Sequence, residues 1–440
     1  MNRSLQETEH YSGNHANIWT REENIPLNII AIIILTAIIL DVAVNILADF
    51  LNLKGLQNKV PAPFQDVYDA DQYQKSQDYL RVNTRFGWIS SAFNLMVLLF
   101  FWFLGGFQTM DAWVRSFDTG PVLTGLFYMG GLMLLYTLLA QPFSAYATFV
   151  IEERFGFNQT TWKTYILDRL KGLAIGLLLG TPLLAGILAF FNYAGKLAWL
   201  YCWLVAVTYM LVVQYVAPTW IMPLFNKFKP LEDGQLKAAI MSYAASIQFP
   251  LKQIYIMDGS KRSRKSNAFF TGFGKNKRIV LFDTLVDQHS VSELVAVLAH
   301  EMGHYKKKHT LQNLVVGVVH TGLMFYLLSF VISYRGLFDA FYMAHISVYA
   351  GLIFFGMLIA PVDFFVGLLT QMRSRHNEYQ ADRFSVKTTA NPTAMIDALK
   401  KLSVHNLSNL RPHPFYVFLN YSHPPVLNRI EAIQKVGADL

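Results

Sequence analysis

Seven long stretches of the chain are almost entirely apolar. Each is near or above the roughly 20 residues that an α-helix needs to cross about 30 Å of hydrocarbon. The fourth and fifth are separated by so short a polar break that they must form a tight hairpin. The pattern therefore predicts a mainly α-helical, polytopic membrane protein with seven spans. These spans cover approximately residues 27–48, 87–107, 121–142, 172–193, 197–217, 311–332 and 346–369.

The polar segment between the fifth and sixth spans shows a different pattern. Residues 231–250 read as an amphipathic helix, and residues 253–257, 268–273 and 278–282 read as strands, the last two joined as a hairpin. Ser290 and Glu293 then form an S-x-x-E capping box, so we expect a helix to begin near Val291 and to run on into the sixth span. The segment therefore predicts a small α+β domain outside the membrane.

Composition agrees with a membrane protein, because only 15% of the 440 residues are charged and 53% are hydrophobic. Of the 37 Lys and Arg residues, five lie on the side of the N-terminus and 32 lie on the other side. By the positive-inside rule, the N-terminus is extracytoplasmic or lumenal, and the segments 218–310 and 370–440 are cytoplasmic. We see no nucleic-acid-binding module, and we expect the basic run Lys261–Lys265 to be a solvated loop.

Cysteine usage limits the chemistry further. The single cysteine, Cys202, lies within the fifth span, which excludes disulfides and thiolate metal sites within the chain.

Within the membrane, the first span carries a polar stripe formed by Asp41, Asn45 and Asp49. Such a stripe either hydrogen-bonds a neighbouring helix or lines a water-filled cavity.

The segment LAHEMGHYKKKH, residues 298–309, carries the main candidate chemistry. His300 and His304 are four residues apart, so their imidazoles project from one face of a helix and can share a tetrahedral Zn²⁺. Glu301 lies between them, where its carboxylate can act as the general base. The motif alone also fits an ordinary surface helix, so the rest of the chain must provide a third ligand.

Glu378 is the strongest candidate for that ligand, because it follows the seventh span directly and has Asp382 one helical turn later. Asp382 could accept the outward N–H of a ligand histidine and so orient it. His376 is a weaker alternative. His309 is excluded as a ligand because, on a continuous helix, it lies about opposite His300.

Hydrolysis of a peptide bond also needs a donor for the oxyanion that develops on the carbonyl. His423, in the segment YSHPPVLNRI, is the candidate, with His405 and His413 as rivals. Arg429 lies nearby in the sequence and could order the carboxylates.

Motifs recur along nearly the whole chain: KSQDY, RFGW, FVIEERFGFNQTT, IMPLFNKFKPL, SNAFFTG, HEMGH, NEYQAD and SHPPVLNR. Together they resemble the type I CAAX prenyl proteases, which are seven-span membrane zinc metalloproteases. The resemblance implies that His300, His304 and Glu378 hold one Zn²⁺, with Glu301 as the general base. It also implies that Asp382 supports a ligand and that His423 stabilises the transition state.

The same resemblance has consequences for the substrate and the fold. Asn267 and the segment from Ala268 to Gly272 would form an edge strand that pairs with the substrate backbone. The seven spans would form a barrel around a chamber, capped by a zincin-like catalytic domain, and the polar stripe of the first span would line that chamber.

We therefore expect five regions. They are an extracytoplasmic arm (1–26), a membrane region with cytoplasmic loops at 52–86 and 143–171 (27–217), a first catalytic part (218–310), spans six and seven (311–369) and a second catalytic part (370–440).

The expected function is zinc-dependent cleavage near the C-terminus of a peptide or protein, with prenylation of the substrate as an open question. A quality-control protease of broad specificity is an alternative, and a non-catalytic transporter or scaffold is a remote one. We expect a monomer. The chain ends in KVGADL without a dilysine-type signal, which favours a bacterial inner membrane over the endoplasmic reticulum.

Overall fold

The computed structural model describes residues 28–271 and 278–439. It contains seven helices long and apolar enough to span a membrane, which confirms the seven predicted spans. The predicted arm at residues 1–26 lies outside the described residues. The spanning helices are α1 (Ile29–Lys54), α2 (Ala70–Phe103), α4 (Pro121–Tyr146), α5 (Trp162–Tyr193), α6 (Ala198–Val216), α11 (His309–Val331) and α13 (Val348–Thr389).

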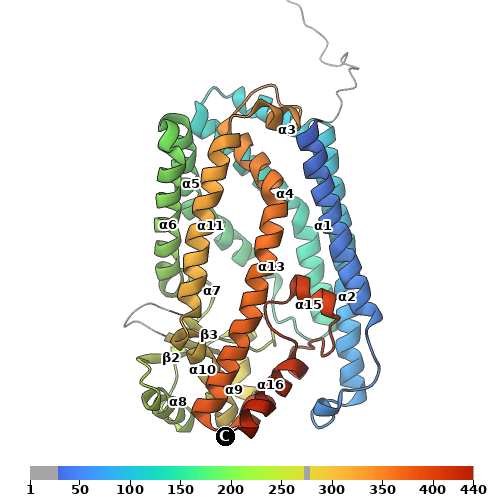
Figure 1. The fold of residues 1–440 in the computed structure, drawn as a ribbon, viewed down its shortest axis with the longest axis vertical. Helices are drawn as coiled ribbons and strands as arrows, with labels where there is room; N and C mark the ends of the chain where they lie inside the picture. Colours follow the sequence, from blue (N-terminus) through green and yellow to red (C-terminus); the bar gives the residue numbers. More distant parts are fainter. Residues whose placement is uncertain (1–27, 272–277, 440) are drawn as a thin grey trace, which may run out of the picture.

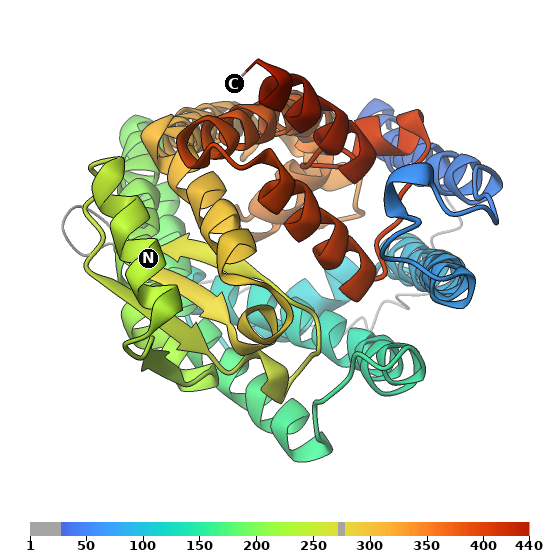
Figure 2. The ribbon, with the colours of Figure 1, turned by 90° about the horizontal axis from the view of Figure 1, so that it is seen from below.

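The spans stand side by side around the long axis of the molecule, as a barrel (Figures 1 and 2). In the most apolar window of each span, only 6% to 17% of the residues are buried. A helix in a tightly packed bundle would bury a whole face, so the wall of this barrel is about one helix thick.

Packed side chains close the end of the barrel that lies beside α3 (Gly106–Arg115) and α12 (Arg335–Asp339). Trp102 is fully buried there and donates a hydrogen bond to the carbonyl of Ala340, at 2.7 Å. The rings of Phe341 and Phe354 stack with their centroids 3.9 Å apart. This cluster holds α1, α2, α4 and α13 together at one end.

The opposite end carries a four-stranded sheet in the order β1-β2-β4-β3 (Figure 2). Strand β2 is parallel to β4, and the other two pairs are antiparallel, so β3 forms one edge of the sheet. All three predicted strands are present; Gly272 and the predicted turn at 274–276 lie outside the described residues. The strands are β1 (Phe228–Pro230), β2 (Gln253–Met257), β3 (Ala268–Thr271) and β4 (Arg278–Phe282).

Helices surround this sheet and bury its core. The capping box predicted at Ser290 and Glu293 is formed, and α10 begins at Val291 as expected. The helices at this end are α8 (Gln235–Ser246), α9 (Asp283–Gln288), α10 (Val291–Lys306), α14 (Pro392–His405), α15 (Pro414–Asn420) and α16 (Val426–Ala438). Short turns of helix elsewhere are Ala62–Phe64, Ala147–Glu152, Gly195–Leu197, Ala217–Ile221, Met222–Phe225 and Gly259–Lys261.

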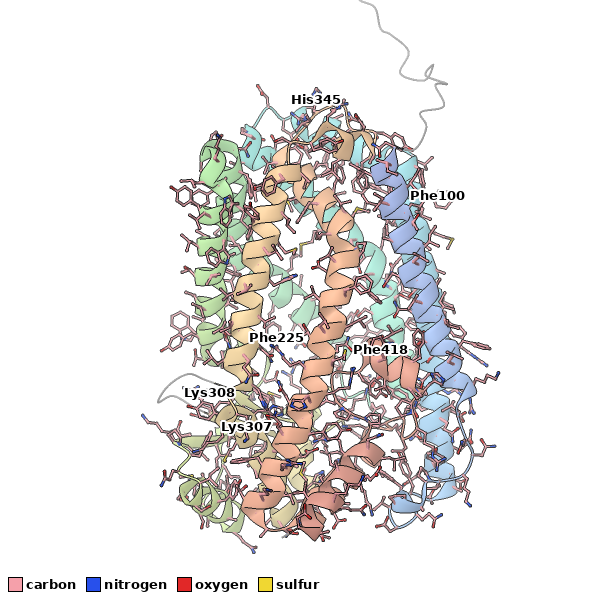
Figure 3. The ribbon with its side chains drawn as sticks, in the orientation of Figure 1. Phe100, Phe225, Lys307, Lys308, His345 and Phe418 are labelled. Carbon is pink, nitrogen blue, oxygen red and sulfur yellow. The ribbon has the colours of Figure 1, made fainter. Side chains whose placement is uncertain are left out.

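The prediction that the helix of His300 continues into the sixth span is wrong. Helix α10 ends at Lys306, Lys308 adopts a left-handed conformation with φ of 59°, and α11 begins at His309. Lys307 and Lys308 lie at the level where the spans meet the sheet domain (Figure 3). Lysine is a good helix former, so nothing in the local sequence announces this break.

The prediction of a solvated loop at Lys261–Lys265 fits the exposed Lys261 and Arg264 but is wrong for Arg262 and Lys265. Arg262 forms a two-pronged ion pair with Asp168 of α5, with N–O distances of 2.8 and 3.0 Å. Lys265 lies 2.9 Å from a carboxylate oxygen of Glu152, at the end of the third span. The run therefore ties the sheet domain to two spans.

The polar stripe on the first span serves at least in part to join helices. Asp49 accepts a hydrogen bond from the indole N–H of Trp88 on α2, at 2.9 Å. Asn45, which is half-buried, donates to the exposed Asp41 one turn earlier on α1, at 3.2 Å.

Helices α10 and α13 approach each other closely at Gly303. A Cβ atom added to Gly303 would lie 3.1 Å from Cδ1 of Phe384 and 3.2 Å from Cα of Ala381, both on α13. The second of these atoms belongs to the backbone and cannot rotate away. Glycine therefore sets the spacing between the two helices.

We predict that Gly303→Ala lowers the free energy of unfolding by about 1–3 kcal/mol, because the added methyl group overpacks the contact with α13. Thermal unfolding of the purified protein in detergent measures this effect. The matched control is Gly317→Ala in α11, where an added Cβ meets nothing within 4 Å. Equal unfolding temperatures for the two variants would contradict the role given to Gly303.

Candidate metal centre

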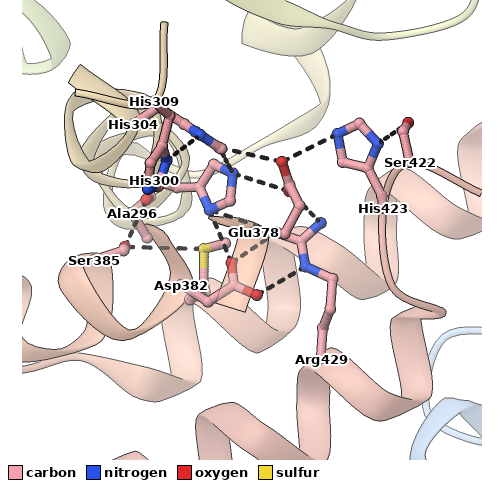
Figure 4. Close-up of polar contacts among 11 residues, drawn as sticks. Ala296, His300, His304, His309, Glu378, Asp382, Ser385, Ser422, His423 and Arg429 are labelled. Carbon is pink, nitrogen blue, oxygen red and sulfur yellow. Dashed lines mark hydrogen bonds and ion pairs between the residues drawn. The ribbon is translucent and has the colours of Figure 1, made fainter. Parts of the chain in front are cut away.

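Two histidines of α10 and one glutamate of α13 converge at a single point (Figure 4). The Nε2 atoms of His300 and His304 are 3.1 Å apart. Glu378 places Oε1 3.2 Å from Nε2 of His304 and Oε2 3.4 Å from Nε2 of His300. The three side chains therefore form a compact triangle in which each oxygen of Glu378 faces one ring nitrogen, and one donor atom from each side chain lies within 4.8 Å of the others.

This triangle fits a metal ion. Ligand atoms about 2.05 Å from a tetrahedral Zn²⁺ are separated from one another by about 3.3 Å, which matches the three distances. Glu378 is buried, and its Oε2 has no hydrogen-bond partner within the described part of the chain. The guanidinium of Arg429 lies 3.8 Å from this oxygen, which leaves the oxygen available to a bound cation that would satisfy it more fully. Among the described residues, this is the one group of three side chains with metal-ligand geometry.

Asp382 lies behind His300, one turn beyond Glu378 on α13. Its Oδ1 is 2.8 Å from Nδ1 of His300, and the carboxylate is 2% exposed. Arg429 of α16 donates two hydrogen bonds to the same carboxylate, at 2.6 and 2.8 Å. Arg429 therefore compensates the buried charge of Asp382 while leaving it free to orient His300.

The charge at the site favours a cation. Burial disfavours the charged form of His300, but the neighbouring carboxylates of Asp382 and Glu378 outweigh this effect and raise its pKa to about 9. The same excess of negative charge that retains a proton would attract a metal ion in its place.

Glu301 lies on α10 beside the two histidines. Within residues 28–271 and 278–439 its carboxylate forms no hydrogen bond or ion pair, so it is free to exchange a proton. Burial is the main reason that the pKa of Glu301 is raised, and the positive potential of the two histidines opposes the shift.

His423 reaches the site from the loop between α15 and α16 (Figure 4). Its Nε2 lies 3.4 Å from Oε1 of Glu378, and its side chain is 62% exposed. On its other side, Nδ1 lies 3.0 Å from the hydroxyl of Ser422. Arg375 of α13 steadies the loop by donating to the carbonyls of Val417 and Tyr421, at 3.2 and 2.5 Å.

The rival histidines have other contacts. His413 caps α15 by accepting from the N–H of Phe415, at 3.2 Å. His405 ends α14 and packs near His289. His376 is exposed and faces Gln380 rather than the triangle of ligands. None of these three belongs to the metal-ligand group.

The predicted edge strand is present from Ala268 to Thr271, and Asn267 directly precedes it. The carbonyl of Asn267 accepts from the N–H of Phe282, and the side chain of Asn267 accepts from the N–H of Ala268, at 3.1 and 2.9 Å. Strand β3 packs against α10, the helix of the two histidines. The third residue of this prediction, Gly272, is not among the described residues.

Sequence reasoning missed His309. It placed this residue opposite the site on an unbroken helix, but the break at Lys308 turns it back toward His304. The two Nδ1 atoms are 3.0 Å apart, and His309 is buried. No local pattern marks the break, so the sequence offers no signal for this contact.

Comparison with known proteins agrees with this architecture. Residues 49–227 match a family described as CAAX prenyl protease N-terminal, five membrane helices, and residues 230–436 match peptidase family M48. A CAAX prenyl protease 1 homolog from Oryza sativa is 36% identical, over 85% of this chain and 90% of that protein. CAAX prenyl protease 1 from Saccharomyces cerevisiae is 34% identical, over 87% and 90%.

A solved structure is also similar. The crystal structure of S. mikatae Ste24p superposes with a TM-score of 0.88 at 32% sequence identity, over 93% of this chain and all of that one. This similarity supports the helical membrane barrel with an attached catalytic domain. The chain is thus a multi-pass membrane metalloprotease that belongs to peptidase family M48 and carries the N-terminal membrane region of the CAAX prenyl proteases.

Proposed function

We propose that this protease is a zinc endopeptidase that cleaves near the C-terminus of prenylated CAAX-type substrates. The triangle of His300, His304 and Glu378 carries the proposal, because its three distances suit Zn²⁺. The names of the relatives support the substrate class.

His300, His304 and Glu378 would hold the ion. A bound Zn²⁺ would lower the pKa of a water molecule at the site and polarise the substrate carbonyl. Glu301 would take a proton from the attacking water and deliver it to the amine that leaves. Its unoccupied carboxylate and its place beside His300 on α10 suit this role.

His423 would donate a hydrogen bond through Nε2 to the developing oxyanion. Its exposed ring lies at the open side of the site, 3.4 Å from Glu378, so a substrate carbonyl held there is within its reach. Arg429 acts on the opposite, buried side by holding Asp382 and the orientation of His300.

Strand β3 would bind the substrate as an added strand. The outer edge of β3, Ala268–Thr271, offers backbone groups to an extended peptide, and β3 lies against the helix of the metal ligands. This arrangement would place a peptide bond of the substrate at the site.

The protein divides functionally in this proposal into a membrane region (27–217), two catalytic parts (218–310 and 370–440) and the two spans between them (311–369). The charge asymmetry supports a cytoplasmic catalytic end, and we propose a monomer as the working unit. Relatives from rice and yeast are eukaryotic, and they give no support to the expected bacterial membrane.

The Glu301→Gln variant should keep one zinc ion per chain and lose about 10²–10⁴-fold in peptide cleavage, because an amide cannot accept the proton. Metal analysis of the purified protein tests the zinc content, and a peptide cleavage assay tests the loss of activity. Glu431→Gln, at an exposed glutamate of α16, is the matched control. A wild-type protein without zinc, or an active Glu301→Gln variant, would favour a scaffold or transporter instead.

The His423→Ala variant should lower kcat by about 10²–10³-fold and leave the zinc content unchanged, because the ring is not a ligand in this proposal. The control is His345→Ala, at the opposite end of the barrel (Figure 3). Loss of zinc in His423→Ala, or an unchanged kcat, would remove His423 from the role of oxyanion donor.

A farnesylated CAAX peptide should be cleaved at least about tenfold faster than the same peptide without its farnesyl group, because burial of the prenyl chain contributes binding energy to the transition state. Rates measured side by side on wild-type protein test this selectivity. Equal rates would favour the quality-control protease of broad specificity.

A further inference from the structure

The two ligand histidines differ in the group that their Nδ1 atoms contact. Nδ1 of His300 faces the carboxylate of Asp382, whereas Nδ1 of His304 faces Nδ1 of His309, at 3.0 Å. His309 is 3% exposed, and it is the first residue of α11. On a continuous helix a residue five positions after His304 would point about 140° away from it. The left-handed conformation of Lys308 is therefore what makes the contact possible.

The hydrogen bonds around His309 have one consistent direction. Nε2 of His304 faces the other ligands, so its lone pair is needed there and the ring proton must be on Nδ1. That proton can be donated only if Nδ1 of His309 accepts. His309 then carries its own proton on Nε2, which lies 3.2 Å from Oε1 of Gln380.

Gln380 continues the same direction. With Oε1 accepting from His309, its amide nitrogen donates to Nε2 of His376, at 2.8 Å. Each of the two intermediate groups is thus used once as a donor and once as an acceptor. The opposite direction would place the proton of His304 on Nε2, where it would prevent metal binding.

The neutral imidazole of His309 also suits the charge of the site. Glu301, Glu378 and Asp382 already bring three carboxylates close together, and Arg429 is paired with Asp382. A second carboxylate behind His304 would add a buried negative charge, which is costly without a partner. An imidazole accepts the hydrogen bond without adding charge.

We propose that His309 is a positioning residue of the metal centre, which fixes His304 in the tautomer and ring orientation that present Nε2 to the metal. Gln380 and His376 hold His309 in turn. This inference rests on the proposed function, in which His304 is a zinc ligand. Partners of this kind typically contribute 10–100-fold to metal affinity.

The test compares two substitutions at one position. His309→Phe keeps an aromatic ring but has no acceptor, whereas His309→Asn places its amide oxygen near the position of the original Nδ1. Zinc affinity is measured by competition with a chelator on the full-length protein in detergent, with thermal unfolding as a check on the fold. We expect about 10–100-fold weaker zinc binding for His309→Phe and near wild-type binding for His309→Asn.

A third variant covers the case in which His309→Phe does not fold. His309→Gln is polar and similar in size, but its amide extends toward Gln380 and leaves Nδ1 of His304 without an acceptor. We expect it to bind zinc more weakly than His309→Asn. Wild-type affinity in His309→Phe, or equal losses in the asparagine and glutamine variants, would overturn the inference.

The same measurements separate this inference from the proposed function. A wild-type protein that holds no zinc contradicts the proposed function itself. A wild-type protein that holds zinc, together with His309 variants that hold it equally well, contradicts only the role of His309.

Discussion

Two buried carboxylates on one turn of α13 are the constraint on which the site depends. Glu378 and Asp382 are 4% and 2% exposed, and buried negative charge is tolerated only with compensation. Arg429 compensates Asp382. Glu378 faces the two imidazoles with one oxygen each, and its Oε2, 3.8 Å from Arg429, has no hydrogen-bond partner among the described residues. The packing of α10 against α13 therefore leaves a buried negative charge beside the two histidines. This charge attracts a cation, as the metal site of a metalloprotease must.

The same two helices connect the site to the membrane. Helix α13 is a single helix of 42 residues that includes the seventh span and both carboxylates, and α10 leads into the sixth span through the break at Lys308. Because a continuous helix transmits position along its length, the depth of the site relative to the bilayer is set by the spans. The ion pairs of Arg262 and Lys265 add a second attachment, from the sheet to other spans.

Many features of the fold could be predicted because their signals are local. Span length follows from runs of apolar residues, and the start of α10 follows from Ser290 and Glu293. Glu378 was preferred to His376 as the third ligand because Asp382 follows it by one helical turn. A carboxylate at that position can orient a ligand histidine. The structure brings Glu378 to the two histidines and leaves His376 outside the ligand group.

The sequence by itself determined the spans, the strands and the side chains able to hold a metal. The periodicity of hydrophobic residues, the helix-capping residues and the spacing of the ligands are all patterns of residues close together in the sequence. Only the tertiary structure decided how these parts meet. Lys308 has no local reason to leave the helix, and Arg262 and Lys265 resemble any solvated basic run until the spans provide Asp168 and Glu152 as partners. The contact between His309 and His304 depends on that break, so it arises from the packing of the chain and not from its local pattern.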